Sequence, residues 1–224
     1  MPADQSHVVI AVDGPSGSGK SSVARGVASK LGYRYLDTGA MYRAMTWWML
    51  DRAIPVDDPA AVAAATDHPV LEVTADPANP SITVDGVDVA EEIRTREVTN
   101  AVSAVSAVPE VRRRLVALQR ALIGNGAIVV EGRDIGTVVA PNATVKVFLV
   151  ADEGTRAARR TDDVHARLGT AVEVTQADLA RRDRLDSTRA ASPLTKAGDA
   201  VEIDSTALGL EEVIDRVLSL VHAA

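Results

Sequence analysis

The chain has 224 residues, of which 46% are hydrophobic and 25% are charged; this composition can bury the core of one domain and excludes a disordered protein. The net charge of −7 argues against a general binder of nucleic acids or of anionic membranes. The lack of cysteine excludes disulfides and thiolate metal sites, and no apolar run approaches the length of a transmembrane helix. Because the N-terminal residues are polar and show no signal peptide, these features predict a soluble cytoplasmic protein.

The first predicted elements are a buried strand over 8–12 and a helix over 22–31, joined by the glycine-rich segment 14–21. This segment matches the pattern G-x-x-x-x-G-K-[ST] of a phosphate-binding loop. Its glycines let backbone N–H groups point at a polyphosphate, and the helix N-terminus adds free donors and partial positive charge. Lys20 is expected to reach the β- and γ-phosphates, and the Ser21 hydroxyl to bind Mg²⁺. The candidate residues for binding a nucleoside triphosphate are Gly14, Pro15, Ser16, Gly17, Ser18, Gly19, Lys20, Ser21 and Ser22.

Two other interpretations of this segment are weaker. A glycine-rich surface turn could end in Lys-Ser by chance, but the strand and the helix on either side argue against it. A dinucleotide-binding turn would need the pattern G-x-G-x-x-G, and Ser22 stands where its third glycine would fall. Binding of a nucleoside triphosphate is therefore the favoured interpretation.

Short elements follow this loop and its helix. They are, in chain order, a strand over 33–36, a helix from Asp37 or Thr38 to about Leu50, and a helix over 59–65. Between 69 and 89 apolar and polar residues alternate around turns, and Asp85-Gly86 is a strong hairpin signal. This region therefore predicts a small antiparallel β insertion.

The second half of the chain alternates helices with short apolar strands. The predicted elements are a helix over 109–123, a strand over 127–130, a strand over 145–150, an arginine-rich helix capped by Asp152, a strand over 200–204 and a helix over 211–221. This order predicts an α/β fold with a parallel sheet that helices cover on both faces. In such sheets ligands bind at the carboxyl ends of strands, where Asp13, Asp37 and the segment 131–134 fall.

Arginines collect in or near loops and helix starts at this end of the predicted sheet. Guanidinium groups bind phosphate oxygens in pairs and stabilise charge on a phosphoryl group in transfer. Their number in an acidic chain suggests two anionic substrates held close together, although any one of them could be an ordinary surface arginine. Arg156 and Arg160, four residues apart, would share one helix face. The arginines in question are Arg43, Arg94, Arg112, Arg133, Arg156, Arg159, Arg160, Arg182 and Arg189.

Five segments together resemble one known family, the bacterial cytidylate kinases. They occur in the family's order and lie within residues 8 to about 205, which is nearly the whole chain. They are Gly14-Pro15-Ser16-Gly17-Ser18-Gly19-Lys20, Leu36-Asp37-Thr38-Gly39-Ala40-Met41-Tyr42-Arg43, Glu92-Ile93-Arg94-Thr95, Gly132-Arg133-Asp134-Ile135-Gly136-Thr137-Val138-Val139 and Arg182-Asp183-Arg184-Leu185-Asp186-Ser187-Thr188-Arg189. One such match is modest support, and five in order are strong.

The resemblance implies the fold of the P-loop nucleoside monophosphate kinases: a five-stranded parallel sheet with helices on both faces, a small antiparallel β insertion and a short arginine-rich lid. The implied division of the single domain is a core over 8–36, 106–155 and 195–222, a monophosphate-binding region over 37–105, and a lid with its following helix over about 156–190. The β insertion at about 69–89 would lie in the monophosphate-binding region. The family is usually monomeric, which implies a monomer here.

The same resemblance implies in-line transfer of the γ-phosphoryl group of ATP to CMP or dCMP, with Mg²⁺. The residues implied to act in catalysis are Lys20, Arg133, Arg160 and Arg189. Lid residues Arg156 and Arg160 would contact the donor phosphates. The acceptor phosphate would be held by Arg43, Arg133 and Arg189, the cytosine by Ser103, Arg112 and Asp134 with Thr38 nearby, and the sugar by Arg182 and Asp186. A carboxylate accepts from the exocyclic amine of cytosine, whereas uracil presents an acceptor there.

Two positions depart from the family pattern. Many members have Ser at the position of Thr38, and here the hydroxyl is retained. Many have Asp at the position of Glu131, and the longer side chain leaves its role undefined, so Glu131 is not included among the expected site residues.

Other nucleotide-binding classes fit less well. A regulatory GTPase would need an Asp-x-x-Gly switch and an Asn-Lys-x-Asp motif, and the chain has neither. A nucleic-acid-dependent ATPase would need a basic binding face. A kinase for another small acceptor, such as UMP, another nucleoside monophosphate or shikimate, shares the loop and the arginines and stays open.

Overall fold

The main sheet has five strands, all parallel. The computed structural model describes residues 7–168 and 176–224. The strands span Val9–Asp13 (β1), Arg34–Asp37 (β2), Ile128–Gly132 (β6), Val145–Val150 (β7) and Val201–Asp204 (β8). Their order across the sheet is β2-β6-β1-β7-β8, so β6 lies between β1 and β2, and β2 pairs with β6 rather than with β1. The expected five-stranded parallel sheet is confirmed.

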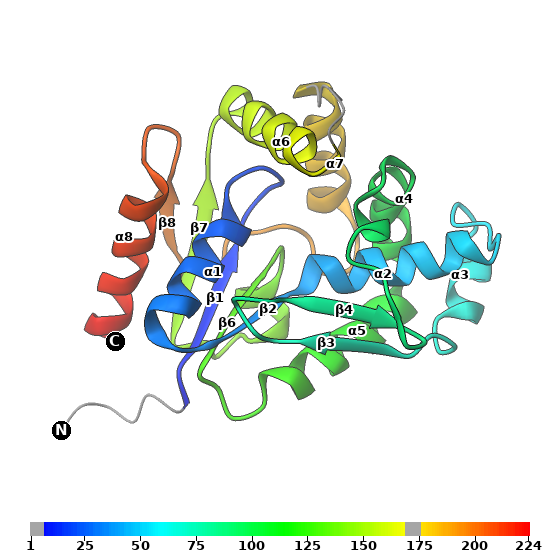
Figure 1. Ribbon diagram of the computed structural model, residues 1–224, viewed down its shortest axis with the longest axis horizontal. Helices are drawn as coiled ribbons and strands as arrows, with labels where there is room; N and C mark the ends of the chain where they lie inside the picture. The colour runs from blue at the N-terminus through cyan, green and yellow to red at the C-terminus, as the bar shows by residue number, and fades with distance from the viewer. Residues whose placement is uncertain (1–6, 169–175) are drawn as a thin grey trace.

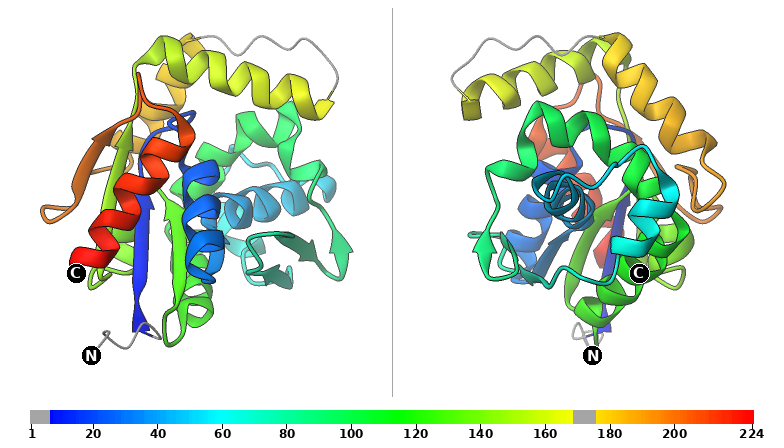
Figure 2. Two further views of the ribbon diagram at one scale, coloured as in Figure 1. Left: turned by 60° about the vertical axis from the view of Figure 1, so that its left-hand side comes forward. Right: turned by 90° about the vertical axis from the view of Figure 1, so that its right-hand side faces the viewer.

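Helices cover both faces of this sheet (Figure 1, Figure 2). On one face α1 (Lys20–Leu31) and α8 (Leu210–Ala223) pack on alternate strand residues, among them Ile10 and Val12. On the other face lie α2 (Thr38–Asp51), α3 (Pro59–Ala65), α4 (Arg96–Ala107) and α5 (Pro109–Ile123), in the same apolar cluster as Ala11. Successive side chains of β1 point to opposite faces of the sheet, so this strand contributes to the apolar core on each face.

Close packing of α1 against α8 occurs at Gly26. A Cβ atom on Gly26 would overlap the Cδ1 atom of Ile214. Gly26→Ala is therefore expected to lower the free energy of unfolding by about 1–3 kcal/mol, because extra volume in a packed contact forces neighbouring groups to shift. Urea unfolding measures this loss, and adding Ile214→Val should recover part of it. A Gly26→Ala variant about 1 kcal/mol more stable, as helix propensity alone favours, would contradict the close approach.

The predicted β insertion is present as a second, antiparallel sheet. Its strands are β3 (Leu71–Thr74), β4 (Ser81–Val84) and β5 (Val87–Asp88), in the order β3-β4-β5. Asp85 and Gly86 form the hairpin turn with φ angles of 52° and 80°, as a two-residue turn of this kind requires. The Asp85 carboxylate accepts from Nε1 of Trp48 at 2.7 Å and from the backbone N–H of Val70 at 2.8 Å, which fixes the insertion on α2.

The helix α4 was not expected from the sequence pattern. Its buried residues include Val102 and Val105, which belong to the same apolar cluster as Met45 of α2. The expected N-cap Asp152 is confirmed, because its Oδ1 accepts from the backbone N–H of Thr155 at 2.9 Å at the start of α6 (Glu153–Leu168).

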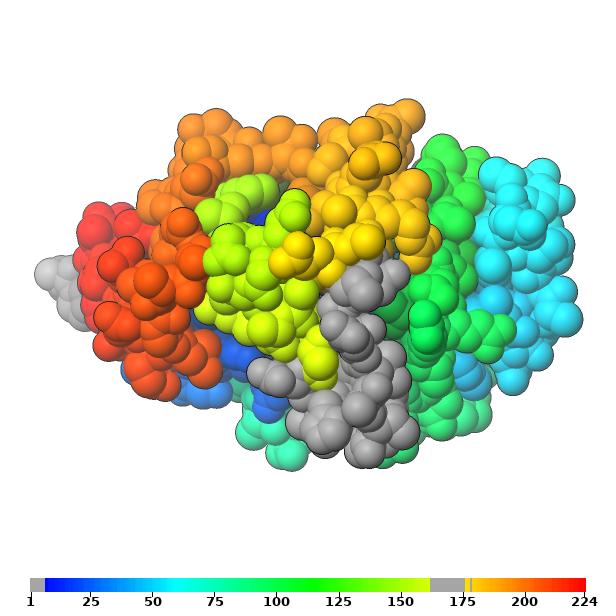
Figure 3. Space-filling model, turned by 90° about the horizontal axis from the view of Figure 1, so that it is seen from above, coloured from blue at the N-terminus to red at the C-terminus, as the bar shows by residue number. Residues whose placement is uncertain are grey.

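The helices α6 and α7 (Gln176–Thr188) lie across the carboxyl ends of the strands (Figure 1, Figure 3). They fall in the region expected as the lid, of which residues 169–175 lie outside the described part. No helix of the described chain is long and apolar enough to cross a membrane. The candidate site therefore lies between the carboxyl ends of β1, β2 and β6 on one side and the helices α6 and α7 on the other.

Candidate active site

The phosphate loop is packed so closely that two of its positions accept only glycine. Gly14 and Gly17 have φ angles of 149° and 79°, which L side chains rarely adopt. A Cβ atom on Gly14 would overlap the carbonyl oxygen of Leu149, and one on Gly17 would lie 2.6 Å from the carbonyl oxygen of Arg156. Gly19, with a φ angle of 90°, is the N-cap of α1. The loop thus folds as the motif predicts, with the N-terminus of α1 directly behind it.

Lys20 is buried, with a side chain that folds back onto the loop. Its Nζ donates to the carbonyl oxygen of Pro15 at 2.7 Å, and Ser18 Oγ donates to the same oxygen at 3.1 Å. Burial, with the positive charge of Arg133 next, lowers the pKa of the Lys20 ammonium. Burial, with the negative charge of Asp37 next, raises the pKa of the Glu131 carboxyl. Burial thus disfavours the charged form of both groups at the base of the loop, and an incoming polyanion would favour the charged form of Lys20.

Two cavities adjoin this loop. The larger, about 910 Å³, runs along α1 from the β3–β4 hairpin to the start of α8. The smaller, about 160 Å³, lies between the loop, α2, α4 and α7. The loop residues Gly17, Lys20 and Ser21 line both cavities, as does Arg160. The two spaces therefore meet at the phosphate loop.

All nine residues expected to bind the acceptor line the smaller cavity. They come from four separate parts of the chain: Thr38, Arg43, Ser103, Arg112, Arg133, Asp134, Arg182, Asp186 and Arg189. Among the described residues that line it, eight are basic and four acidic, in a chain whose net charge is −7. Positive charge is thus concentrated here against the overall balance of the molecule, as a site for a polyanion requires.

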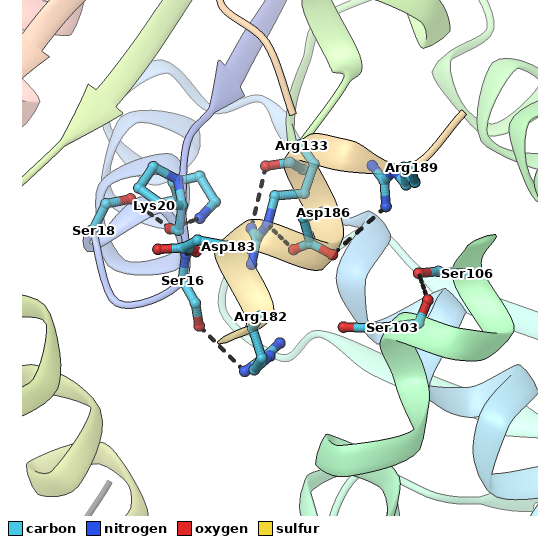
Figure 4. Close-up of polar contacts among 12 residues, drawn as sticks. Ser16, Ser18, Lys20, Ser103, Ser106, Arg133, Arg182, Asp183, Asp186 and Arg189 are labelled. Atoms are coloured by element: carbon cyan, nitrogen blue, oxygen red, sulfur yellow. Dashed lines mark hydrogen bonds and ion pairs between the residues drawn. The ribbon is translucent and has the colours of Figure 1, made fainter. Parts of the chain in front are cut away.

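Asp186 on α7 holds two of the arginines in place. Its carboxylate accepts from Arg133 Nε at 3.1 Å and lies 3.8 Å from Arg189 Nη1 (Figure 4). Arg182, one turn earlier on the same helix, donates through Nη1 to the Ser16 hydroxyl at 3.3 Å. Burial, followed by the charges of Arg133 and Arg160, lowers the pKa of Arg182 to about 10. These guanidinium groups repel one another, so an anion among them would be bound strongly.

The innermost end of the smaller cavity holds a buried ion pair. Arg112 Nη2 donates to the Asp134 carboxylate, and the two side chains are 4% and 5% exposed. The Arg112 guanidinium also lies 5.2 Å from the centre of the Tyr42 ring. Arg112 donates a further bond to the carbonyl oxygen of Ser106 at 3.2 Å. This end therefore offers a fixed acceptor beside a fixed donor, which can read the edge of a planar base.

The other expected acceptor residues also line this cavity. Arg43 on α2 donates to the carbonyl oxygen of Ile93 at 3.0 Å and to Thr99 Oγ1 at 2.9 Å. Burial, with repulsion from Arg182 and Arg160, lowers its pKa. Thr38 Oγ1 donates to the carbonyl oxygen of Glu131 at 2.7 Å. Ser103 is buried on α4 and lies below Arg189 in the view of Figure 4.

The two lid arginines differ in position. Arg160 lines both cavities, whereas Arg156 is buried and donates to the Ser16 carbonyl oxygen at 3.1 Å and to the Asp183 carboxylate. Arg156 thus connects α6 to the phosphate loop and to α7. Three of the residues expected to bind ATP line neither cavity: Gly14, Pro15 and Arg156. Their expected contact with ATP phosphates stays a prediction.

Sequence reasoning missed several residues that line or support the site. Glu131 is 4% exposed and lines the smaller cavity, and Asp37 and Tyr42 line it too. The available signal was positional: Glu131 and Asp37 both end predicted strands, and the sheet pairs them in register. Asp183, whose carboxylate accepts from Arg156, had no such signal, because its partner lies 27 positions away. Arg159, one of the arginines singled out in the sequence, donates to Ser205 Oγ at 2.9 Å.

Comparisons with known proteins agree on one family. The sequence pattern of the family described as cytidylate kinase matches residues 10–223. The cytidylate kinase of Streptomyces coelicolor is 57% identical over 217 residues, which cover 96% of this chain and 93% of that protein. The cytidylate kinase of Streptomyces griseus is 54% identical over 220 residues, which cover 97% and 94% respectively. A solved shikimate kinase from Acinetobacter baumannii, in complex with shikimate, is 17% identical over 99% of this chain and 96% of that one, with a TM-score of 0.48; a likeness at that level carries no argument about substrate.

Proposed function

The chain belongs to the cytidylate kinase family, and we infer from this that it transfers the γ-phosphoryl group of ATP to CMP and dCMP. One observation supports the residue assignments: the nine expected acceptor residues line a single small cavity that adjoins the phosphate loop. A kinase of UMP or of a shikimate-like acceptor is not favoured, because relatives that match nearly the whole chain are cytidylate kinases.

CMP occupies the smaller cavity in this proposal. Its cytosine lies at the inner end, where Asp134 accepts from the exocyclic amine and Arg112 donates to the ring carbonyl and N3. Arg182 and Asp186 are assigned to the sugar. The phosphate lies toward the loop and is bound by three arginines, Arg43, Arg133 and Arg189. Thr38 and Ser103 complete the walls of the cavity.

ATP takes the larger cavity. Its phosphates are bound by the N–H groups of the loop, by Lys20 and by the lid arginines Arg156 and Arg160. The cavity continues from the loop to Ser205, Leu208 and the start of α8, and this apolar end is assigned to the adenine. The two phosphate ends then meet where Gly17, Lys20 and Arg160 line both cavities.

The donor set near the loop suits Mg²⁺, which prefers oxygen ligands and is commonly held by one or two protein groups together with substrate phosphates. The Ser21 hydroxyl donates to Glu131 Oε2 at 3.0 Å, so its proton is engaged and its lone pairs are available to a cation. Ser21 is assigned as the protein ligand. Held there, Mg²⁺ would supply positive charge that neutralises the donor phosphates.

Catalysis in this arrangement is alignment and charge neutralisation. The CMP phosphate is already anionic, so no general base is needed to generate the nucleophile. Lys20, Arg133, Arg160 and Arg189 surround the position of the transferring group and stabilise the charge spread over its oxygens. Closure of α6 and α7 over the loop would keep water from the γ-phosphate. We assign the enzyme to the cytoplasm, where both substrates are available, as a monomer, because one chain supplies all of these residues.

One assay tests the proposal. The protein is incubated with ATP and Mg²⁺ and with CMP, dCMP, UMP, AMP or shikimate in turn, and formation of ADP is measured. CMP and dCMP are expected to be phosphorylated with kcat/KM at least about 100-fold above the other acceptors, because uracil and adenine do not match the Arg112–Asp134 pair. Preference for any other acceptor, or no transfer at all, would refute the assignment.

A further inference from the structure

Glu131 is a buried carboxylate that the binding scheme above does not use. It is the penultimate residue of β6, which lies between two strands, and it is paired with Val12 of β1 and Asp37 of β2. Both of its oxygens are engaged: Oε2 accepts from Ser21 Oγ at 3.0 Å, and Oε1 accepts from the Tyr35 hydroxyl. Three residues from separate parts of the chain are thus linked by hydrogen bonds beneath the phosphate loop.

These bonds fix the direction of the Ser21 hydroxyl. A hydroxyl has one proton to donate and two lone pairs to offer. Because Ser21 donates its proton to Glu131, below the loop, its lone pairs are left for a ligand on the side of the cavities that Ser21 lines. A serine free to rotate would also populate orientations that point the proton at the cation, and these would weaken binding.

Tyr35 in turn fixes Glu131. Its side chain is 2% exposed and packs in the apolar cluster beneath α1, so its hydroxyl has a set position. Burial, followed by the charge of Glu131, raises the pKa of the Tyr35 phenol, which therefore stays protonated and acts as a donor. Without that donor, one buried carboxylate oxygen would lose its partner and the carboxylate could turn away from Ser21.

We propose that Tyr35 is a positioning residue for the Mg²⁺ site, which acts through Glu131: its hydroxyl fixes the carboxylate that holds the Ser21 hydroxyl in its metal-binding orientation. The inference rests on the proposed function, because Ser21 is the metal ligand only in that scheme. Partners of a metal ligand commonly change metal affinity 10–100-fold when they are removed. A tyrosine outside the phosphate-loop motif is thus expected to change the affinity for Mg²⁺.

Binding without turnover gives the test. The dissociation constant of a non-hydrolysable ATP analogue is measured by calorimetry in EDTA and in Mg²⁺, for the wild type, Tyr35→Phe and Glu131→Gln. In EDTA the wild type and Tyr35→Phe should bind within about twofold of each other, and the Mg²⁺ effect of every protein is taken relative to its own binding in EDTA. The strengthening of binding by Mg²⁺ should fall about tenfold in Tyr35→Phe and further in Glu131→Gln. Tyr33→Phe makes the same chemical change two residues away and should leave the Mg²⁺ effect unchanged.

A second comparison shows whether Tyr35 acts through Ser21. In a Ser21→Ala background, Tyr35→Phe should cause no further loss of the Mg²⁺ effect, because the hydroxyl it positions is gone. An unchanged Mg²⁺ effect in Tyr35→Phe, or full additivity with Ser21→Ala, would overturn the inference. If Tyr35→Phe fails to fold, as shown by its thermal melt, the same two comparisons with Glu131→Gln decide it. Failure of the wild type to phosphorylate CMP would instead overturn the proposed function, so the two failures are distinct.

Discussion

Arg133→Ala is expected to lower kcat for CMP phosphorylation by about 10²–10³-fold, and Arg189→Ala by a similar factor. Both guanidinium groups line the smaller cavity, to which we assign the acceptor phosphate, and Asp186 lies 3.1 Å from Arg133 and 3.8 Å from Arg189. Their charge matters most when the phosphoryl group is between donor and acceptor, so the loss should be in turnover. Affinity for ATP should change little, since the phosphate loop supplies most of its contacts. Steady-state kinetics with CMP and calorimetry with an ATP analogue measure the two quantities.

Arg184→Ala is the matched control for this prediction. Arg184 is an exposed residue on α7, the helix that carries Asp186, and its truncation should leave kcat unchanged. Arg133→Lys keeps the charge but cannot reproduce the bond from Nε to Asp186, so we expect it to recover only part of the activity. Near-normal turnover in both alanine variants would remove the proposed role of these arginines.

Asp134→Asn is expected to lower kcat/KM for CMP by about 100-fold and to lower the preference for CMP over UMP. An ionised carboxylate only accepts hydrogen bonds, whereas an amide can also donate to the oxygen that uracil presents. Hydrogen bonds to charged groups contribute about 1.5–3 kcal/mol, which corresponds to a factor of about 10–150. The UMP rate should fall less than the CMP rate, or rise. Both are measured with the same enzyme under saturating ATP.

The substitution also leaves the Arg112 guanidinium without its counter-charge in a buried position, since the two side chains are only 4% and 5% exposed. A loss of stability of about 3–5 kcal/mol is the usual consequence of breaking such a pair, so urea unfolding must accompany the kinetics. Asp199→Asn makes the same change in an exposed carboxylate that pairs with Lys146 at 2.6 Å, away from the site. Unaltered CMP preference in a folded Asp134→Asn variant would contradict the assignment of the base pocket.

The local features of this protein were predictable because short stretches of chain determine them. Gly14, Gly17 and Gly19 have φ angles that other residues rarely adopt, so the loop needs glycine at these positions. Their spacing therefore identifies the loop from the sequence alone. The hairpin at Asp85-Gly86 is of the same kind. The alternation of short apolar strands with helices was sufficient to predict a parallel sheet, because few other arrangements bury such strands on both faces.

Pairing between distant side chains depended on the tertiary structure. Arginines could be predicted to gather at one end of the sheet, but the partner of each could not: Asp186 holds Arg133, 53 positions away, and Asp183 holds Arg156. Even the helix α4, which carries Ser103, follows no strong local signal and is stabilised by its packing on α2.

The sequence by itself determined the phosphate loop, the class of fold and the small set of residues that line the smaller cavity. Only the tertiary structure decided that β6 lies between β1 and β2, and so brought Glu131 to Ser21 and to Tyr35, 110 and 96 positions away in the chain. The physical reason is that local conformation follows from the preferences of neighbouring residues, whereas the partner of a buried charge is set by which strands the packing of the core makes adjacent.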